Sequence, residues 1–188
     1  AFLVLIGIRL MSSPKTAVKG NRIGAAAMFA AIVVVLIYNE IVNVPLLWVA
    51  VILGGILGYA MALRVKMIQM PQMVALLNGL GGGASALVAL VEIFERYHEM
   101  ISFGRLTSQL ALAVGAVTLS GSLIAAGKLD RRISQKPVIM ENHSKIANTV
   151  LSIVVILVIL SSVTSIPWII VASIITALFA LAYGVLFA

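Results

Sequence analysis

Charged residues are absent from five long stretches of the sequence, and their spacing constrains the fold more than any other feature. No Asp, Glu, Lys or Arg occurs in residues 23–39, 41–63, 67–91, 106–127 and 146–188. An α-helix rises about 1.5 Å per residue, so about 20 residues cross the hydrocarbon core of a bilayer. The first four stretches therefore each predict one membrane-spanning helix. The fifth has 43 residues and predicts two.

The two ends of the chain and the last long stretch complete this outline. Residues 161–167 (SSVTSIP) predict the turn between the last two helices, because the Ser/Thr cluster suits a loop and Pro167 suits a helix start. Residues 1–8 are apolar but too short to cross a membrane, so we interpret them either as the end of a first helix or as a segment whose beginning is missing. The predicted fold is an all-α polytopic transmembrane helix bundle with about seven membrane segments. We expect residues 1–188 to form a single transmembrane domain that is part of a longer subunit.

Composition supports the membrane assignment and excludes several classes of protein. Apolar residues make up 62% of the chain and charged residues only 10%, against about 25% charged residues in ordinary soluble domains. A soluble domain could not cover its surface with so few charges. Cysteine is absent, which excludes disulfides, thiol catalysis and metal sites with cysteine ligands.

The basic residues are distributed unequally between the two sides of the predicted bundle. Alternate loops place 11 Lys and Arg residues on one side and 2 on the other. The positive-inside rule assigns the side with 11 to the cytoplasm. We therefore expect the start of the chain outside and Ala188 in the cytoplasm. The net charge of +7 then reflects topology, and nucleic-acid binding is not predicted.

Small residues recur at a spacing of four within several predicted helices. Gly54 and Gly58 form one such pair, and Gly79 and Gly83 form another. Helices in lipid associate largely through close backbone contact, which small residues permit. We interpret these pairs as helix-packing sites without a ligand.

Polar side chains at membrane depth are the strongest functional signal. Asn78 and Ser85 share one face of the 67–91 helix, and Thr118 and Ser122 share one face of the 106–127 helix. Counted from Lys66, Asn78 lies roughly 18 Å from the membrane border; counted from Lys128, Thr118 lies roughly 15 Å and Ser122 roughly 9 Å from it. If the faces meet, they form a polar ladder from the inner surface to mid-membrane. The alternative for each Ser or Thr is a bond to a carbonyl of its own helix, whereas Asn78 has four bonding sites to satisfy.

Catalytic and metal-binding constellations are not found in the sequence. The two histidines, His98 and His143, are predicted to lie in loops among charges, and no metal-ligand spacing occurs. Glu92, Glu95, Arg96 and Glu99 suit a solvated helix end. Composition and spacing thus predict a polytopic bundle with a sparse polar path and no catalytic residues.

Three segments resemble signatures of the proton-translocating nicotinamide nucleotide transhydrogenases. Residues 70–79 (MPQMVALLNG) and 115–129 (GAVTLSGSLIAAGKL) are similar to the membrane domain of the beta subunit of that family. Residues 16–21 (TAVKGN) give a third, weaker match. The matches fall in the order and at separations typical of the family.

The resemblance implies a role in a redox-driven proton pump. In that family a hydride passes between NAD(H) and NADP(H), which are held by soluble domains, and proton passage through the membrane domain is coupled to this transfer. The chain would be the proton-conducting part, in the cell inner membrane, with no cofactor of its own and no catalytic activity alone. The soluble NADP(H)-binding domain and two further membrane helices would follow Ala188. The complex is expected to be a homodimer with its nucleotide domains in the cytoplasm.

Two of the polar residues stand at positions that the family resemblance links to the proton path. Ser122 matches a family position implicated in the proton path, and Asn78 stands where many members have a histidine. Asparagine cannot take up a proton near neutral pH, whereas histidine can. In one branch of the family a membrane helix of the alpha subunit supplies the histidine, so the resemblance implies that Asn78 orients that histidine or a water. The predicted proton path then includes Asn78, Ser85, Thr118 and Ser122.

A second function class stays open at this point. The chain could instead be a transporter or channel subunit without redox coupling, and the bundle alone is compatible with both. The two specific motifs favour the transhydrogenase.

Overall fold

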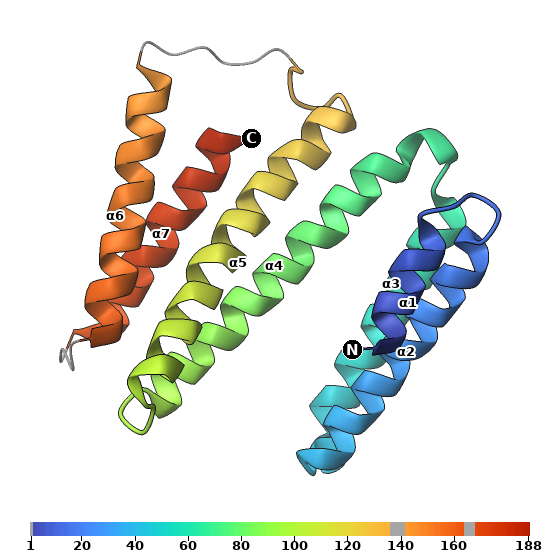
Figure 1. Ribbon diagram of the computed structural model, residues 1–188, viewed down its shortest axis with the longest axis horizontal. Coiled ribbons are helices and arrows are strands. Elements are labelled where there is room, and N and C mark those ends of the chain that lie inside the picture. The colour runs from blue at the N-terminus through green and yellow to red at the C-terminus, as the bar shows by residue number, and fades with distance from the viewer. Residues whose placement is uncertain (1, 136–141, 164–167) are drawn as a thin grey trace. The chain divides into compact units, whose positions relative to one another are not determined.

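The computed structural model describes residues 2–135, 142–163 and 168–188, and these residues form seven α-helices (Figure 1). Six of the seven are long and apolar enough to cross a membrane. The predicted all-α polytopic architecture with about seven membrane segments is therefore confirmed, and the chain is a multi-pass membrane protein. The helices are α1 (Phe2–Met11), α2 (Ala17–Tyr38), α3 (Pro45–Arg64), α4 (Met70–Arg96), α5 (Ser102–Leu129), α6 (His143–Val163) and α7 (Ile169–Phe187).

The chain divides into two compact units, Ala1–Arg64 and Val65–Ala188. In the first unit, α1 and α2 pack closely because both present glycine at their contact. A methyl group added at Gly20 would lie 2.7 Å from the carbonyl oxygen of Gly7 and 2.7 Å from the amide nitrogen of Met11. The interpretation of residues 1–188 as one transmembrane domain stays a prediction.

Helix α3 begins at Pro45, a residue suited to the first turn of a helix, and none of its residues is buried. Within the first unit, and outside the nearby backbone of α3 itself, no described atom lies within 4 Å of a methyl group placed at Gly54, Gly55 or Gly58. The prediction that Gly54 and Gly58 mark a close helix contact is thus not met by any helix of the first unit. Small residues permit two helices to approach closely, but a close contact also requires a second helix that packs against them.

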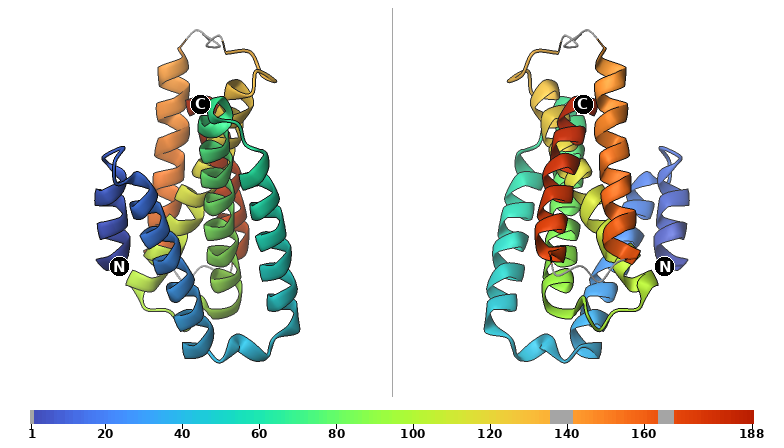
Figure 2. Two further views of the ribbon diagram at one scale, coloured as in Figure 1. Left: turned by 90° about the vertical axis from the view of Figure 1, so that its right-hand side faces the viewer. Right: turned by 90° about the vertical axis from the view of Figure 1, so that its left-hand side faces the viewer.

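In the second unit, α5 is the central helix and packs against α4, α6 and α7. The three views show these four helices running side by side (Figures 1 and 2). One apolar cluster joins Ile93 and Leu112 to Ile169, and a second joins Ala116 to Val158 and its neighbours. The core of this unit therefore lies along α5.

Glycines set the distance between α4 and α5. A methyl group added at Gly115 would lie 2.6 Å from the carbonyl oxygen of Gly82, and one added at Gly82 would lie 2.7 Å from the Cβ atom of Thr118. Gly79 and Gly83 are buried against the same neighbour, near Ser122 and Leu119. The predicted packing role of Gly79 and Gly83 is confirmed by these contacts.

The turn before α7 differs in part from its prediction. Ser161, Ser162 and Val163 belong to α6. The hydroxyls of Ser161 and Ser162 donate to the carbonyl oxygens of Leu157 and Val158, each at 2.6 Å. These bonds satisfy the side chains within the helix, so the Ser pair does not end it. The remaining predicted turn residues, 164–167, lie outside the described residues.

Candidate functional site

Asn78 on α4 and Ser122 on α5 form a direct hydrogen bond. The Asn78 side-chain Nδ2 donates to Ser122 Oγ at 2.9 Å. Gly79 makes this possible, because a methyl group added there would lie 3.1 Å from the Ser122 Cβ atom. The two helices that the sequence predicted to share a polar ladder therefore do meet at these residues.

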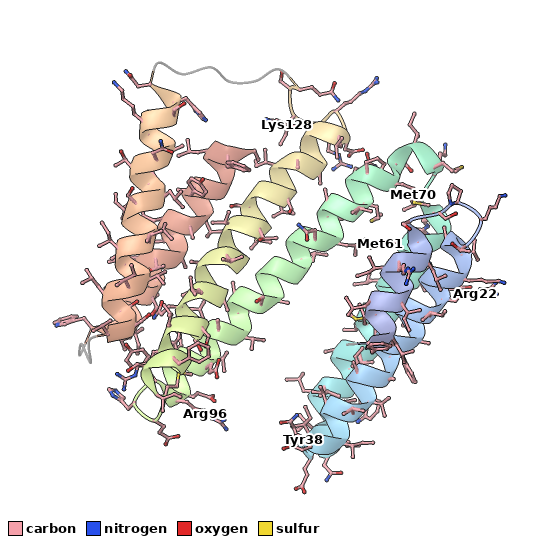
Figure 3. The ribbon with its side chains drawn as sticks, viewed as in Figure 1. Arg22, Tyr38, Met61, Met70, Arg96 and Lys128 are labelled. Atoms are coloured by element: carbon pink, nitrogen blue, oxygen red, sulfur yellow. The ribbon has the colours of Figure 1, made fainter. Side chains whose placement is uncertain are left out.

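The pairing of Asn78 with Ser122 relates two depths that the sequence analysis counted from different residues, and the depth of Asn78 in a membrane stays a prediction. Residues Met67–Gln69 form a 3₁₀ turn between Lys66 and α4, which begins at Met70. From Met70, Asn78 lies about 12 Å along the helix, and Ser122 lies about 9 Å from Lys128. Met70 and Lys128 lie at the same end of the α4–α5 pair, and Arg96 lies at the other (Figure 3).

Thr118 and Ser85 do not join this hydrogen bond. The Thr118 hydroxyl donates to the Val114 carbonyl oxygen of its own helix at 2.7 Å, and its Cβ atom lies opposite Gly82 on α4. Ser85 is exposed on α4, two turns beyond Asn78. The structure thus brings together two of the four predicted residues and leaves Thr118 as a packing contact.

The Asn78–Ser122 pair lies at the surface of the part of the chain that the structure describes. Asn78 is exposed and Ser122 is half-buried. In the hydrocarbon region of a membrane, a polar amide without a hydrogen-bonding environment costs several kcal/mol. Ser122 occupies one of the four bonding sites of the amide, so the others require water or another protein chain.

A cavity opens between α4 and α5 at the end of the helices that carries Lys128. It has a volume of ≈ 280 Å³ and lies between the two helices. Its lining includes Gln72 and Leu76 from α4 and Leu123 from α5, together with Asp130 and Arg132 after α5. Leu123 adjoins Ser122 in the sequence and Leu76 lies two residues before Asn78, but neither Asn78 nor Ser122 lines this cavity.

Gln109 is a buried polar residue that the sequence analysis missed. It is 0% exposed, and its Nε2 donates to Ser173 Oγ on α7 at 2.8 Å. Its Oε1 is buried with no hydrogen-bond partner among the described residues. Gln109 is the only amide side chain in the charge-free stretch 106–127, and that signal could have identified it.

The connection between α4 and α5 is held by Tyr97 and Arg105. The Tyr97 hydroxyl donates to the Ser161 carbonyl oxygen of α6. The Arg105 guanidinium carbon lies 4.7 Å from the centre of the Tyr97 ring, and its Nε donates to the Tyr97 carbonyl oxygen at 3.2 Å. Burial raises the pKa of the Tyr97 phenol, and the Arg105 charge opposes this increase. The phenol therefore stays a neutral hydrogen-bond donor.

Comparison with known proteins shows which family the chain matches. The family model described as NAD(P) transhydrogenase beta subunit matches residues 1–188. The NAD(P) transhydrogenase subunit beta of Rhodospirillum rubrum, and that of a named strain of the same species, are each 38% identical to the chain over 143 residues. The match covers 72% of this chain and 31% of each relative. The chain thus spans under a third of the length of these relatives.

Proposed function

Because the chain belongs to the NAD(P) transhydrogenase beta subunit family, we propose that it is the proton-translocating membrane domain of a transhydrogenase. Proton passage through it is coupled to hydride transfer between NAD(H) and NADP(H). The observation that carries this proposal is the Asn78–Ser122 hydrogen bond at 2.9 Å. It joins two polar side chains of different membrane-spanning helices, neither of which carries a charged residue near the pair.

Asn78 acts in this proposal as an orienting group, because an amide does not take up a proton near neutral pH. The proton carrier is a histidine on a membrane helix of the alpha subunit, as the family resemblance implies. Two features support this arrangement. Asn78 is exposed on the described chain, and its amide has bonding sites beyond the one used by Ser122.

The nucleotides are bound elsewhere in the complex. NAD(H) and NADP(H) are held by soluble domains, and this chain supplies neither cofactor site nor hydride chemistry by itself. The complex is a homodimer in the cell inner membrane. The basic loops face the cytoplasm, as the 11-to-2 distribution of Lys and Arg favours.

Proton pumping by the complete enzyme tests the proposal. The transhydrogenase containing this chain is reconstituted in sealed vesicles, and internal pH is followed while hydride passes between NAD(H) and NADP(H). We expect proton movement that stops with the nucleotide reaction and collapses when a protonophore is added. Hydride transfer without any proton movement, at a rate indifferent to the protonophore, would refute the coupling.

The orientation can be tested separately with single-cysteine variants, because the chain contains no native cysteine. Variants at Ser12 and Ser134 are expected to react with a membrane-impermeant thiol reagent only from the cytoplasmic side. A variant at Ser102 should react only from the outside. Reaction of Ser134 and Ser102 variants from the same side would contradict the topology.

A further inference from the structure

Three exposed polar residues follow each other along α4 at intervals of seven. Asn78, Ser85 and Glu92 are all exposed in the described chain. A heptad step rotates an α-helix by only about 20° from a whole number of turns, so the three side chains share one face. This polar stripe runs from the Asn78–Ser122 pair to the end of α4 that is opposite the basic loops.

A groove between α4 and α5 contains the outer two members of the stripe. It has a volume of ≈ 300 Å³ and is lined by Ser85, Glu92, Ala84, Val88, Ala89 and Ala111. Three of these residues are alanines, whose small side chains leave the space open. One water needs only about 10–15 Å³ of such space, together with two or more polar partners. The groove is therefore large enough for water, and Ser85 and Glu92 supply polar atoms.

The Glu92 carboxylate is fixed in this groove by α5. Ser108 Oγ donates to Glu92 Oε2 at 2.9 Å, and Ser108 is only 5% exposed. Glu92 also lines a neighbouring groove of ≈ 490 Å³ with Glu95 and Arg96. The interpretation of Glu92 as part of a solvated helix end is therefore incomplete, because a buried hydroxyl of another helix positions its carboxylate.

We propose that Glu92 is the proton-exchanging group at the mouth of the half-path that leads to Asn78 from the side opposite the basic loops, with Ser85 between them. This inference rests on the proposed function. Each heptad step spans about 10 Å along α4, which is longer than a hydrogen bond. In this proposal waters in the groove connect Glu92 to Ser85, and further waters along the same face of α4 connect Ser85 to Asn78. The Glu92 carboxylate accepts a proton from a hydronium ion of the bulk solvent, which becomes water as its O–H bond breaks and the carboxyl O–H bond forms. The carboxyl O–H bond then breaks as a groove water takes the proton and becomes hydronium, and Glu92 returns to its ionised form.

The charged residues around Glu92, and the grooves that each of them lines, distinguish Glu92 from the other acidic residues at this end of α4. Glu95 and Arg96 lie on α4 beside it. Arg105 on α5 is engaged with Tyr97 through its Nε atom. Glu95 lines only the outer of the two described grooves, whereas Glu92 lines both. Glu95 is therefore the matched control.

The test uses the complete enzyme in sealed vesicles with three variants, Glu92→Gln, Glu92→Asp and Glu95→Gln. Glutamine keeps the shape of Glu92 and can still accept the Ser108 hydrogen bond, so a purely structural role would survive this change. We expect Glu92→Gln to lower the rate of proton pumping by about 100-fold, the lower end of what a positioned acid–base group contributes. Glu92→Asp should retain more pumping than Glu92→Gln, and Glu95→Gln should pump at the wild-type rate.

Two further readouts separate the possible outcomes. Thermal stability and nucleotide reactions that need no proton passage should be unchanged in Glu92→Gln, which shows that the variant is folded. Normal pumping by Glu92→Gln, or an equal loss in Glu95→Gln, would overturn this inference while wild-type pumping still supports the proposed function. Absence of pumping by the wild-type enzyme would overturn the proposed function itself.

Discussion

Replacing Asn78 with leucine in the complete enzyme is expected to lower proton pumping by about 100-fold, the loss typical when one positioned hydrogen-bond donor is removed. Leucine has a similar volume but cannot donate to Ser122 Oγ, the contact made at 2.9 Å. Nucleotide reactions that require no proton passage should persist. If the bond only holds α4 and α5 together, the free energy of unfolding should fall by about 1 kcal/mol while pumping survives.

The measurement combines proton pumping in vesicles with thermal stability of the same variant. Asn148→Leu is the matched control, because it makes the same exchange at an exposed asparagine of another membrane helix, α6. It should leave pumping unchanged. Pumping at the wild-type rate in Asn78→Leu would remove Asn78 from the mechanism and leave it as a packing residue.

Replacing Gly115 with valine is expected to destabilise the α4–α5 pair and to disrupt the site at the same time. The added Cβ atom alone would lie 2.6 Å from the Gly82 carbonyl oxygen and 2.8 Å from the Ala86 amide nitrogen. Both atoms are backbone, so α4 must move away, and overpacking of this kind costs about 1–3 kcal/mol. The same displacement should break the Asn78–Ser122 hydrogen bond, so that pumping falls together with stability.

Gly81→Val is the control for this prediction. Outside the nearby backbone of its own helix, no described atom lies within 4 Å of a methyl group placed at Gly81, although Gly81 lies on α4 beside Gly82, the residue that Gly115 contacts. The intrinsic effect of valine in a helix is therefore present without the clash. Thermal unfolding in detergent should show a clearly lower midpoint for Gly115→Val than for Gly81→Val. Equal midpoints would mean that the two helices do not need their close approach.

The helices were the most predictable part of the molecule. Charges are excluded from the hydrocarbon core so strongly that their absence alone locates six membrane-spanning helices. Helix ends were less predictable, because hydroxyls can be satisfied inside a helix. Ser161 and Ser162 resemble a loop in the sequence, yet both bond to carbonyls of α6.

The helix faces that meet at the site were predictable from the sequence, but the relative level of the residues along the two helices was less so. The spacing of Asn78 and Ser122 indicated which sides of two helices could meet, and the hydrogen bond joins them. No sequence signal showed that residues Met67–Gln69 form a 3₁₀ turn between Lys66 and α4, so the sequence did not show that Asn78 and Ser122 lie at one level. Gln109 was overlooked because it lies near one end of its helix, and its burial depends on α7, which is 64 residues away in the sequence.

The hydroxyl groups of α6 and α7 are held by hydrogen bonds within their own helices, which limits their ability to transfer protons. Ser152, Ser161, Ser162, Ser173 and Thr176 each donate to a carbonyl oxygen one turn earlier in their own helix. A hydroxyl whose hydrogen is held in this way cannot pass a proton onward until that bond breaks. If the chain translocates protons as proposed, these hydroxyls would not form a second proton path through α6 and α7. Such a second path would let protons return across the membrane and would dissipate the gradient that the proposed pump builds.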